Sequence, residues 1–166
     1  MITYRNATMD DCLAIATLKG IVWNTTYKGI YSDDSLANYD IPKNQRIFEQ
    51  IVHNPDIELY VATDNDKIVG FMTCGKPYKP YRDFGQEIGL LYILQDYQRR
   101  GIGNQFFQIA RRQMLADGYG KFLVSVNKLN QPAIDFYHAM GGRIIEATDT
   151  QLKLEFHLDS AEKQTT

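Results

Sequence analysis

The sequence predicts an α/β fold in which about seven strands form a mixed central sheet flanked by about four helices. Segments with the two-residue period of strands alternate along the chain with segments of helical period. Residues 87–94 (EIGLLYIL) are apolar on both alternating faces, which is typical of a strand covered on both sides. Residues 102–114 place apolar side chains on one helical face and polar ones on the other. Together these patterns favour helices on both faces of the sheet.

The chain begins with a strand and a helix. Residues 2–7 (ITYRNA) alternate like a strand. Thr8, with Asp11 three residues later, resembles a capping box at the start of a helix. We expect this helix to continue to about Trp23, where the helical spacing ends.

A loop, a second helix and a strand pair follow. Residues 24–41 are rich in Tyr, Asp and Gly and indicate a loop, after which Pro42 starts a helix. Residues 57–63 and 67–75 are rich in strand formers, and the turn residues 64–66 (DND) lie between them. This arrangement predicts a hairpin.

The second half of the chain alternates strands and helices. Residues 76–85 (KPYKPYRDFG) interrupt the pattern before the buried strand. Gly118 ends the amphipathic helix, and residues 121–126 indicate a short strand. Residues 130–141 begin with Asn and Pro and end with Gly, which is typical of a helix. A final β-pair is predicted in two segments: 143–148 and 151–158.

Size and charge predict one domain that binds no nucleic acid. The 166 residues, 44% hydrophobic and 23% charged, suit a single compact soluble domain over residues 1–158, with a flexible tail at 159–166. The net charge of −2 and a pI near 5.9 offer no basic excess for a polyanion. Any anion must therefore be bound locally.

The remaining composition predicts a cytoplasmic protein without a metal centre. Cys12 and Cys74 lie in different predicted elements without metal-ligand spacing, so we interpret them as buried, reduced thiols. The three histidines show no metal-ligand spacing either. No signal-like segment and no apolar run near the roughly 18 residues of a membrane span occurs, so we expect no membrane association.

The stretch 98–107 (QRRGIGNQFF) lies between the buried strand and the first turn of a helix, where backbone N–H groups and the helix dipole favour an anion. Gly101 and Gly103 would let the backbone approach a phosphate closely. A P-loop would need Gly-Lys-Ser/Thr, which is absent, and a dinucleotide fingerprint would need a small residue where Phe106 stands. The alternative is a tight turn whose arginines are merely solvated.

Two motifs at a suitable separation favour the anion-binding loop over the simple tight turn. Residues 98–103 match the pattern Q/R-x-x-G-x-G/A, and residues 130–141 match N-x-x-A-x-x-x-Y-x-x-x-G through Asn130, Ala133, Tyr137 and Gly141. With these motifs the chain resembles the GNAT superfamily of acyl-CoA-dependent N-acetyltransferases, and the predicted order of strands and helices agrees with that family. Gly142 departs from the family, in which an aromatic residue commonly follows this glycine.

The resemblance implies a coenzyme A site and acetyl-CoA as co-substrate. Backbone amides from Arg99 to Gly103 would hold the pyrophosphate, the end of the strand at 91–94 would pair with the pantetheine arm, and the amide near Ile93 would bind the thioester carbonyl. A fixed N–H there would meet the charge that grows on the carbonyl oxygen. The cofactor-binding residues implied are Leu91, Tyr92, Ile93, Gln98, Arg99, Arg100, Gly101, Ile102, Gly103 and Asn130.

Two residues are implied as catalytic. Glu87 lies eleven residues before Gln98, the spacing at which some family members carry a glutamate base; it could act directly or through water, or be a solvated carboxylate at a strand end. Gly89 stands where many relatives have a second acid. Tyr137 matches the family's general acid and would stabilise the departing thiolate by a hydrogen bond; it also belongs to the apolar stripe of its helix.

The acceptor is expected to be an amine, held by aromatic loops. In the family, the acceptor approaches over the loops that correspond to residues 23–40 and 76–85. Asp33, Asp34 and Asp40 could attract a cationic amine. Ordinary packing of a polar surface loop is the alternative for each of these residues. The side chains expected to shape the acceptor slot are Trp23, Tyr27, Tyr31 and Tyr81, together with Tyr78.

Two classes of function remain at this point. The first is an N-acetyltransferase that moves an acetyl group from acetyl-CoA directly to a primary amine of a small molecule, polyamine-like or other, or to an exposed protein amine. The second is a non-catalytic acyl-CoA-binding sensor that kept the cofactor cleft. Glu87 and Tyr137 favour the enzyme. A homodimer would be common in the family.

Overall fold

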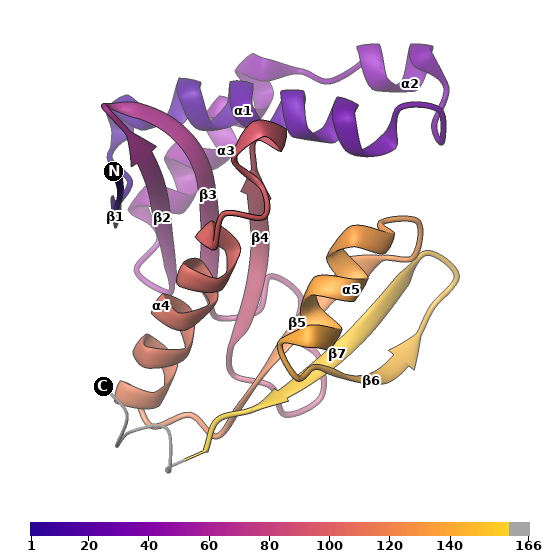
Figure 1. Cartoon of the computed structure of the whole chain (residues 1–166). Helices are drawn as coiled ribbons and strands as arrows, with labels where there is room; N and C mark the ends of the chain where they lie inside the picture. Colours follow the sequence, from indigo (N-terminus) through magenta and orange to yellow (C-terminus); the bar gives the residue numbers. More distant parts are fainter. Residues whose placement is uncertain (160–166) are drawn as a thin grey trace. The chain divides into compact units, whose positions relative to one another are not determined.

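The computed structural model describes residues 1–159 and has the predicted α/β architecture (Figure 1). Within these residues seven strands are present: β1 (Ile2–Asn6), β2 (Ile57–Asp64), β3 (Lys67–Gly75), β4 (Glu87–Ile93), β5 (Lys121–Asn127), β6 (Arg143–Ala147) and β7 (Gln151–His157). The helices of the same residues are α1 (Cys12–Tyr27), α2 (Asp33–Ala37), α3 (Ile41–His53), α4 (Ile102–Ala116) and α5 (Gln131–Ala139), with short 3₁₀ turns η1 (Met9–Asp11) and η2 (Gln95–Tyr97).

The strands form one mixed sheet in the order β1-β2-β3-β4-β5-β7-β6. β4 pairs with β5 in parallel, whereas β1 with β2, β5 with β7 and β6 with β7 are antiparallel. The prediction of a mixed sheet with residues 87–94 as a central strand is therefore confirmed. The chain divides into two compact units, and β4 and α4 each run through both.

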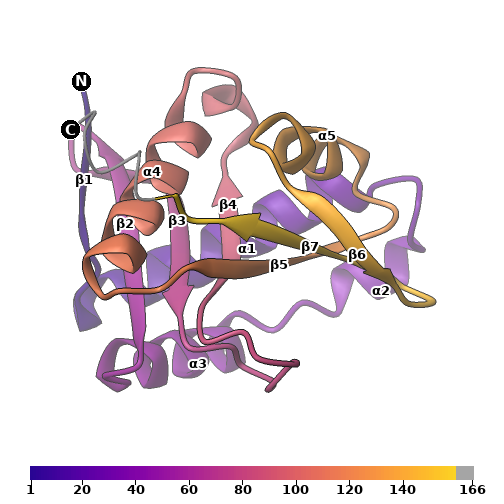
Figure 2. The same cartoon turned by 90° about the horizontal axis from the view of Figure 1, so that it is seen from below.

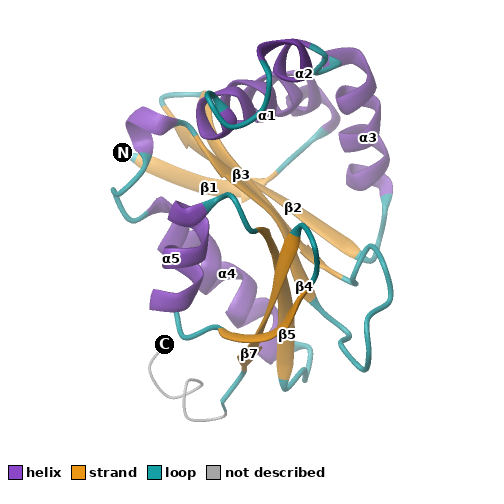
Figure 3. Cartoon of the chain, turned by 90° about the vertical axis from the view of Figure 1, so that its right-hand side faces the viewer, coloured by secondary structure: helices purple, strands orange, loops and turns teal. Residues whose placement is uncertain are grey.

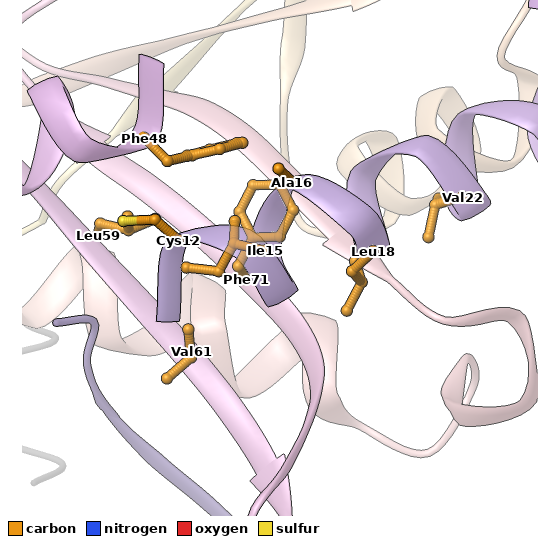
Figure 4. Close-up of a cluster of buried hydrophobic side chains, with 9 residues drawn as sticks. All are labelled: Cys12, Ile15, Ala16, Leu18, Val22, Phe48, Leu59, Val61 and Phe71. Atoms are coloured by element: carbon orange, nitrogen blue, oxygen red, sulfur yellow. The ribbon is translucent and has the colours of Figure 1, made fainter. Parts of the chain in front are cut away.

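The first unit comprises Met1–Cys74 and Leu90–Phe107. Its core lies between the helices α1 and α3 and one face of the strands β2 and β3, which Figure 3 shows edge-on. Figure 4 shows nine of its buried side chains: Cys12, Ile15, Ala16, Leu18, Val22, Phe48, Leu59, Val61 and Phe71. The rings of Phe48 and Phe71 meet edge to face at 5.2 Å, so α3 is fixed on β3.

The opposite face of these strands carries the beginning of α4. Phe106 is fully buried and its ring meets that of Tyr4 at 5.4 Å. A Cβ atom at Gly70 would lie 3.1 Å from the Tyr92 carbonyl oxygen and 3.3 Å from the Phe106 ring. Gly70 therefore allows α4 and the end of β4 to lie close to β3.

The second unit comprises Gly75–Gly89 and the chain from Gln108. Phe122 of β5 is paired with Phe156 of β7, and their rings stack at 4.8 Å. Tyr137 of α5 meets the Phe156 ring at 6.2 Å, so α5 covers this face (Figure 2). β5, β7 and α5 therefore share a core in which the Phe156 ring contacts both Phe122 and Tyr137.

The expected elements differ from the structure mainly between Asn24 and Pro42. The first helix does not end near Trp23 but continues to Tyr27, because Tyr27 is buried and extends the apolar face by one turn. Within the expected loop, Ser32 also caps the short helix α2 by accepting a hydrogen bond from the Ser35 amide. The loop prediction was wrong for these two stretches.

Three local predictions are confirmed in atomic detail. The Asp11 carboxylate accepts a hydrogen bond from the Thr8 amide, which completes the capping box. Asn65 and Asp66 adopt the positive φ of 47° and 69° that a two-residue hairpin turn requires. Asn130 caps α5, which then begins with Pro at its second residue.

Some expectations lie beyond what the structure tests. Of the predicted tail 159–166, residues 160–166 lie outside the described residues. Among the helices of residues 1–159, none combines the length and the apolarity that a membrane crossing needs. The same residues contain no group of three or more His, Cys, Asp or Glu side chains able to hold a metal ion.

Candidate active site

The glycine loop of the first unit has a backbone suited to an anion. After η2 the chain turns sharply, with Arg99 at φ 61° and Gly101 at φ 86°, and α4 begins at Ile102. Left-handed residues among ordinary ones bring successive N–H groups into a concavity that binds anions. Gly101 makes this turn without strain, because it carries no Cβ.

The first turn of α4 adds further donors. The Gln105 amide donates to the Gly101 carbonyl at 3.0 Å, which is the first hydrogen bond of the helix. The preceding amides of Ile102 and Gly103 have no acceptor inside the helix. The positive end of the helix dipole lies at the same place. Loop and helix together offer main-chain donors to a phosphate.

Side chains around this loop hold it in position. The Gln98 side-chain amide donates to the Ile93 carbonyl at 2.9 Å, which ties the loop to the end of β4. The Tyr97 hydroxyl donates to Asp64 at 2.8 Å, and the Arg100 guanidinium lies 5.0 Å from the centre of the Tyr97 ring. The structure therefore gives Gln98 and Arg100 contacts within the protein that the sequence did not predict.

The end of β4 is half-buried. Tyr92 stacks on Phe71 at 5.3 Å with an interplanar angle of 11°, and burial raises the pKa of its hydroxyl. Leu91 and Ile93 are half-buried, and the Leu94 amide donates to the Val69 carbonyl at 2.9 Å. The pairing of Leu91, Tyr92 and Ile93 with a pantetheine arm stays a prediction.

Glu87 opens β4 and belongs to the second unit. Its carboxylate is half-buried, and its Oε1 atom accepts a hydrogen bond from the Tyr78 amide at 2.8 Å. Burial raises the pKa of Glu87, while the Tyr78 hydrogen bond and the charge of Lys153 oppose the rise. A carboxyl whose pKa lies above its ordinary value is a stronger base than an exposed glutamate.

Tyr81 lies against two cations of the second unit instead of open solvent. Lys153 Nζ lies 4.7 Å from the centre of the Tyr81 ring and the Arg82 guanidinium 5.0 Å from it. Phe84 stacks near the same ring at 6.0 Å. Two protein cations already use this ring, which weakens its case as a binding surface for a cationic acceptor.

Glu87 and Tyr137 lie on opposite faces of the second unit's strands. Glu87 is paired with Leu123, and Leu123 with Glu155, so these side chains share one face. Phe156, the next residue along β7, points to the other face, where Tyr137 packs against it. A reaction that used both residues would therefore need one side chain from each face of these strands.

Tyr137 and Asn130 come from the same helix. Tyr137 is buried, with its ring at 5.2 Å from Phe136. Asn130 Oδ1 accepts a hydrogen bond from the Ala133 amide at 3.3 Å, as a helix cap does. Its amide nitrogen can still donate to a ligand while the oxygen serves the cap.

The remaining aromatic residues predicted for the acceptor form a separate cluster in the first unit. Tyr27 lies 4.5 Å from Trp23 and 4.8 Å from Tyr31, measured between ring centres. Tyr27 is buried, whereas Trp23 and Tyr31 are half-buried and can contact a ligand. Asp40 is occupied as the cap of α3, since its Oδ1 atom accepts from the Lys43 amide.

The packing around Gly142 explains why this position departs from the expected motif. A Cβ atom at this position would lie 2.6 Å from the Phe156 ring and 3.0 Å from Leu154. Phe156 therefore fills the space in which an aromatic residue at position 142 would lie. The departure affects packing and leaves Tyr137 in place.

Sequence reasoning missed Lys153 and Tyr97. Lys153 comes close to Tyr81 only because β7 pairs with β5, and Tyr97 reaches Asp64 only because η2 lies against the β2–β3 hairpin. Neither residue belongs to a motif, so no local signal in the sequence could have found them.

Comparison with known proteins defines the class. The profile described as the acetyltransferase (GNAT) family matches residues 23–141, so the chain belongs to this family. It is therefore an acetyl-CoA-dependent acetyltransferase, with acetyl-CoA as co-substrate and an amine as acceptor.

Three relatives illustrate the match. The chain is 28% identical over 141 residues to an uncharacterized N-acetyltransferase, YuaI, of Bacillus subtilis, covering 84% of this chain and 79% of that protein. It is 24% identical over 100 residues to N-alpha-acetyltransferase 30 of Schizosaccharomyces pombe, covering 60% and 67%. The fold matches that of the PaiA N-acetyltransferase from Thermoplasma acidophilum, solved with coenzyme A, at a TM-score of 0.84 and 20% identity, covering 95% and 99%.

Proposed function

We propose that this chain transfers an acetyl group from acetyl-CoA directly to a primary amine, either of a small molecule or exposed on a protein. The observation that carries the proposal is the left-handed turn at Arg99 and Gly101, which leads into the N-terminus of α4 within a GNAT fold. A relative of the same fold was solved with coenzyme A, which supports the same donor here.

In this proposal the donor is held mainly by main chain. Amides from Arg99 to Gly103 bind the pyrophosphate, and the β4 segment Leu91–Ile93 pairs with the pantetheine arm. The Ile93 amide would donate to the thioester carbonyl, where negative charge grows as the amine attacks. Gln98 supports this arrangement by holding the Ile93 carbonyl, and Asn130 adds its side-chain amide to the pantetheine.

Glu87 would act as the base. An amine with a pKa of about 10.4 costs roughly 4 to 5 kcal/mol to deprotonate at neutral pH. A carboxylate with a raised pKa lowers this cost by accepting the proton directly or through a water molecule. The half-buried environment of Glu87 supports this role.

Tyr137 would serve the leaving group. The amine nitrogen forms a bond to the acetyl carbon, the C–S bond breaks, and the electron pair leaves with sulfur as a thiolate. The Tyr137 hydroxyl donates a hydrogen bond to this thiolate during cleavage, and the proton released from the amine passes to Glu87 or water. No covalent enzyme intermediate is needed.

One relative bears on the kind of acceptor. The similarity to an N-alpha-acetyltransferase favours a protein amine over an amine of a small molecule. Trp23 and Tyr31 are the half-buried rings of the first unit that would contact the acceptor, with Tyr27 supporting them. We further propose one catalytic domain over residues 1–158 in the cytoplasm, since Cys12 and Cys74 are free, buried thiols.

The test is release of free thiol from acetyl-CoA in the presence of polyamines, amino acids, aminoglycosides and peptides with free N-termini. We expect one class to be turned over at a rate well above hydrolysis without acceptor. The same protein is titrated with coenzyme A by calorimetry. Tight binding of the cofactor without any accepted amine would overturn the proposal in favour of an acyl-CoA sensor.

A further inference from the structure

Lys153 of β7 lies on the same face of the sheet as Glu87 and belongs to no motif of the family. Its Nζ atom donates to Ser125 Oγ at 3.2 Å and lies 4.7 Å from the centre of the Tyr81 ring. Lys153 is half-buried, so its ammonium is held in one place by these contacts. Ser125 is its pairing partner in β5, on the face of the sheet that also carries Glu87.

The loop between β3 and β4 contacts both Lys153 and Glu87. Tyr81 of this loop lies under Lys153, and the Tyr78 amide of the same loop donates to Glu87 Oε1 at 2.8 Å. Arg82 adopts a positive φ of 46°, which is unfavourable for a residue with a side chain and shows that the surrounding contacts fix the loop. Tyr78 is 85% exposed as a side chain, so its amide is what this part of the loop contributes.

We propose that Lys153 and Tyr81 are positioning residues for Glu87, through the ammonium on the same face of the sheet and through the loop whose Tyr78 amide holds Oε1. This inference rests on the proposed function, in which Glu87 is the base. The amide fixes one carboxylate oxygen and leaves the other for the amine or a bridging water. The ammonium keeps the half-buried carboxyl ionised, so that it can accept a proton.

Other charges of the same unit do not replace Lys153 in this role. Asp83 and Lys121 are paired with each other at 2.7 Å, as are Arg143 and Glu155 at 2.8 Å. The charge that acts on the Glu87 carboxyl is that of Lys153. The further titratable groups of the loop and of the neighbouring strands are Lys76, Tyr78, Lys79, Tyr81, Arg82, Glu146 and His157.

The experiment is the pH profile of kcat/KM for one accepted amine, so that the titration of the amine itself is common to all variants. Lys153→Met removes the charge and keeps most of the volume. Without the ammonium Glu87 is protonated at higher pH, so we expect a loss of roughly tenfold near pH 6 and less than about twofold near pH 9. Lys153→Arg restores the profile, and the KM for acetyl-CoA stays unchanged.

Tyr81 is tested by two substitutions. Tyr81→Phe keeps the ring, and the buried Tyr81 hydroxyl has no hydrogen-bond partner of good geometry among residues 1–159, so we expect a wild-type profile. Tyr81→Leu removes the ring beneath Lys153 and loosens the loop, so we expect kcat to fall several-fold. Lys121→Met is the matched control: it removes a lysine that lies 4.4 Å from the ring of another loop residue, Phe84, and should leave the pH dependence unchanged.

Glu87→Gln separates the two proposals. If Glu87→Gln keeps wild-type kcat/KM, Glu87 is not the base and the proposed mechanism fails together with this inference. If kcat/KM falls in Glu87→Gln but the pH profile of kcat/KM for Lys153→Met is parallel to that of wild type, only the positioning role is wrong. In the Glu87→Gln background, Lys153→Met should add no pH-dependent loss, because the group on which it acts is gone.

Discussion

The two compact units of the chain contribute different kinds of chemistry. In the proposed mechanism, the first unit contributes the glycine loop from Arg99 to Gly103, whose functional groups are backbone amides. The second would contribute Glu87 and Tyr137, whose functional groups are side chains in particular environments. Backbone recognition depends on the conformation of a short segment, whereas the reactivity of a side chain depends on whatever packs around it.

This contrast predicts how substitutions in the two units should behave. A change in the loop should alter the affinity for coenzyme A and leave the chemical step alone once the cofactor is saturating. A change at Glu87 should do the reverse. Failure of the predictions for Glu87 or for the donor loop would contradict this separation.

The largest effect is expected for Glu87→Gln, which keeps the shape and removes the base. We expect kcat to fall by roughly 10² to 10⁴-fold, the usual contribution of a general base. Because burial raises the pKa of Glu87, wild-type activity should fall as pH drops through that raised pKa, and this limb should vanish in the variant. Stopped-flow detection of free coenzyme A at saturating acetyl-CoA measures both.

The affinity for coenzyme A provides the internal control for this variant. Calorimetric titration should give the same Kd for Glu87→Gln as for wild type within about twofold, well under 1 kcal/mol. A large loss of affinity would mean that Glu87 belongs to the donor site and that the division of labour between the units is wrong.

The second largest effect is expected on stability, at Gly142. A methyl group there would lie 2.6 Å from the Phe156 ring, so Gly142→Ala should overpack the core of the second unit by about 1 to 3 kcal/mol. A chain of this size should lose roughly 2 to 4 °C of Tm for each kcal/mol. Gly120→Ala is the control, because a Cβ atom there meets nothing within 4 Å. Equal Tm values for the two variants would contradict the packing argument.

Local features of this fold could be predicted from the sequence, and distant ones could not. The capping box of Thr8 and Asp11 and the turn at Gly101 depend on residues within a few positions of each other, and both were predicted. The partners of Glu87 come from elsewhere in the sequence: Tyr78 from a loop without periodicity, and Lys153 from the last strand.

The loop between α1 and α3 shows the same limit at the level of secondary structure. Residues 24–27 have poor helix propensity, yet the burial of Tyr27 against Trp23 and Tyr31 extends α1 through them. Tertiary packing outweighs local propensity here. Gly142 is similar, since only the position of Phe156 explains why this residue is small.

A third prediction concerns the donor loop. Gly101→Ala places a side chain at φ 86°, which costs roughly 1 to 2 kcal/mol and should weaken coenzyme A binding by about 5 to 30-fold. Arg100→Ala should cost less, because in the proposed site the backbone amides hold the pyrophosphate. Gly118→Ala has the same kind of backbone, at φ 87°, after α4 ends, so it controls for strain outside the loop. Calorimetry with coenzyme A measures all three, and an affinity loss greater for Arg100→Ala would reverse the proposed roles.

The smallest effect is expected at Asp11, in the first unit. Its carboxylate accepts two hydrogen bonds from Arg5, at 2.7 and 3.0 Å, and one from the Thr8 amide, and the Arg5 bond is the main cause of its lowered pKa. A carboxyl with a lowered folded-state pKa stabilises the fold above its unfolded pKa of about 3.9 and loses this contribution as pH falls through the folded-state value.

Asp11→Asn should therefore cost about 1 kcal/mol at pH 7, because the exposed Arg5 lets solvent screen the pair, and close to nothing in strong acid. Urea unfolding at both pH values measures the difference. Asp10→Asn removes the neighbouring carboxylate and leaves the pair of Arg5 and Asp11 intact. Its free energy of unfolding should therefore equal that of wild type at both pH values. If the Asp11→Asn deficit persisted in acid, the loss would come from the geometry of the cap and the charge of Asp11 would contribute nothing to holding η1 against β1.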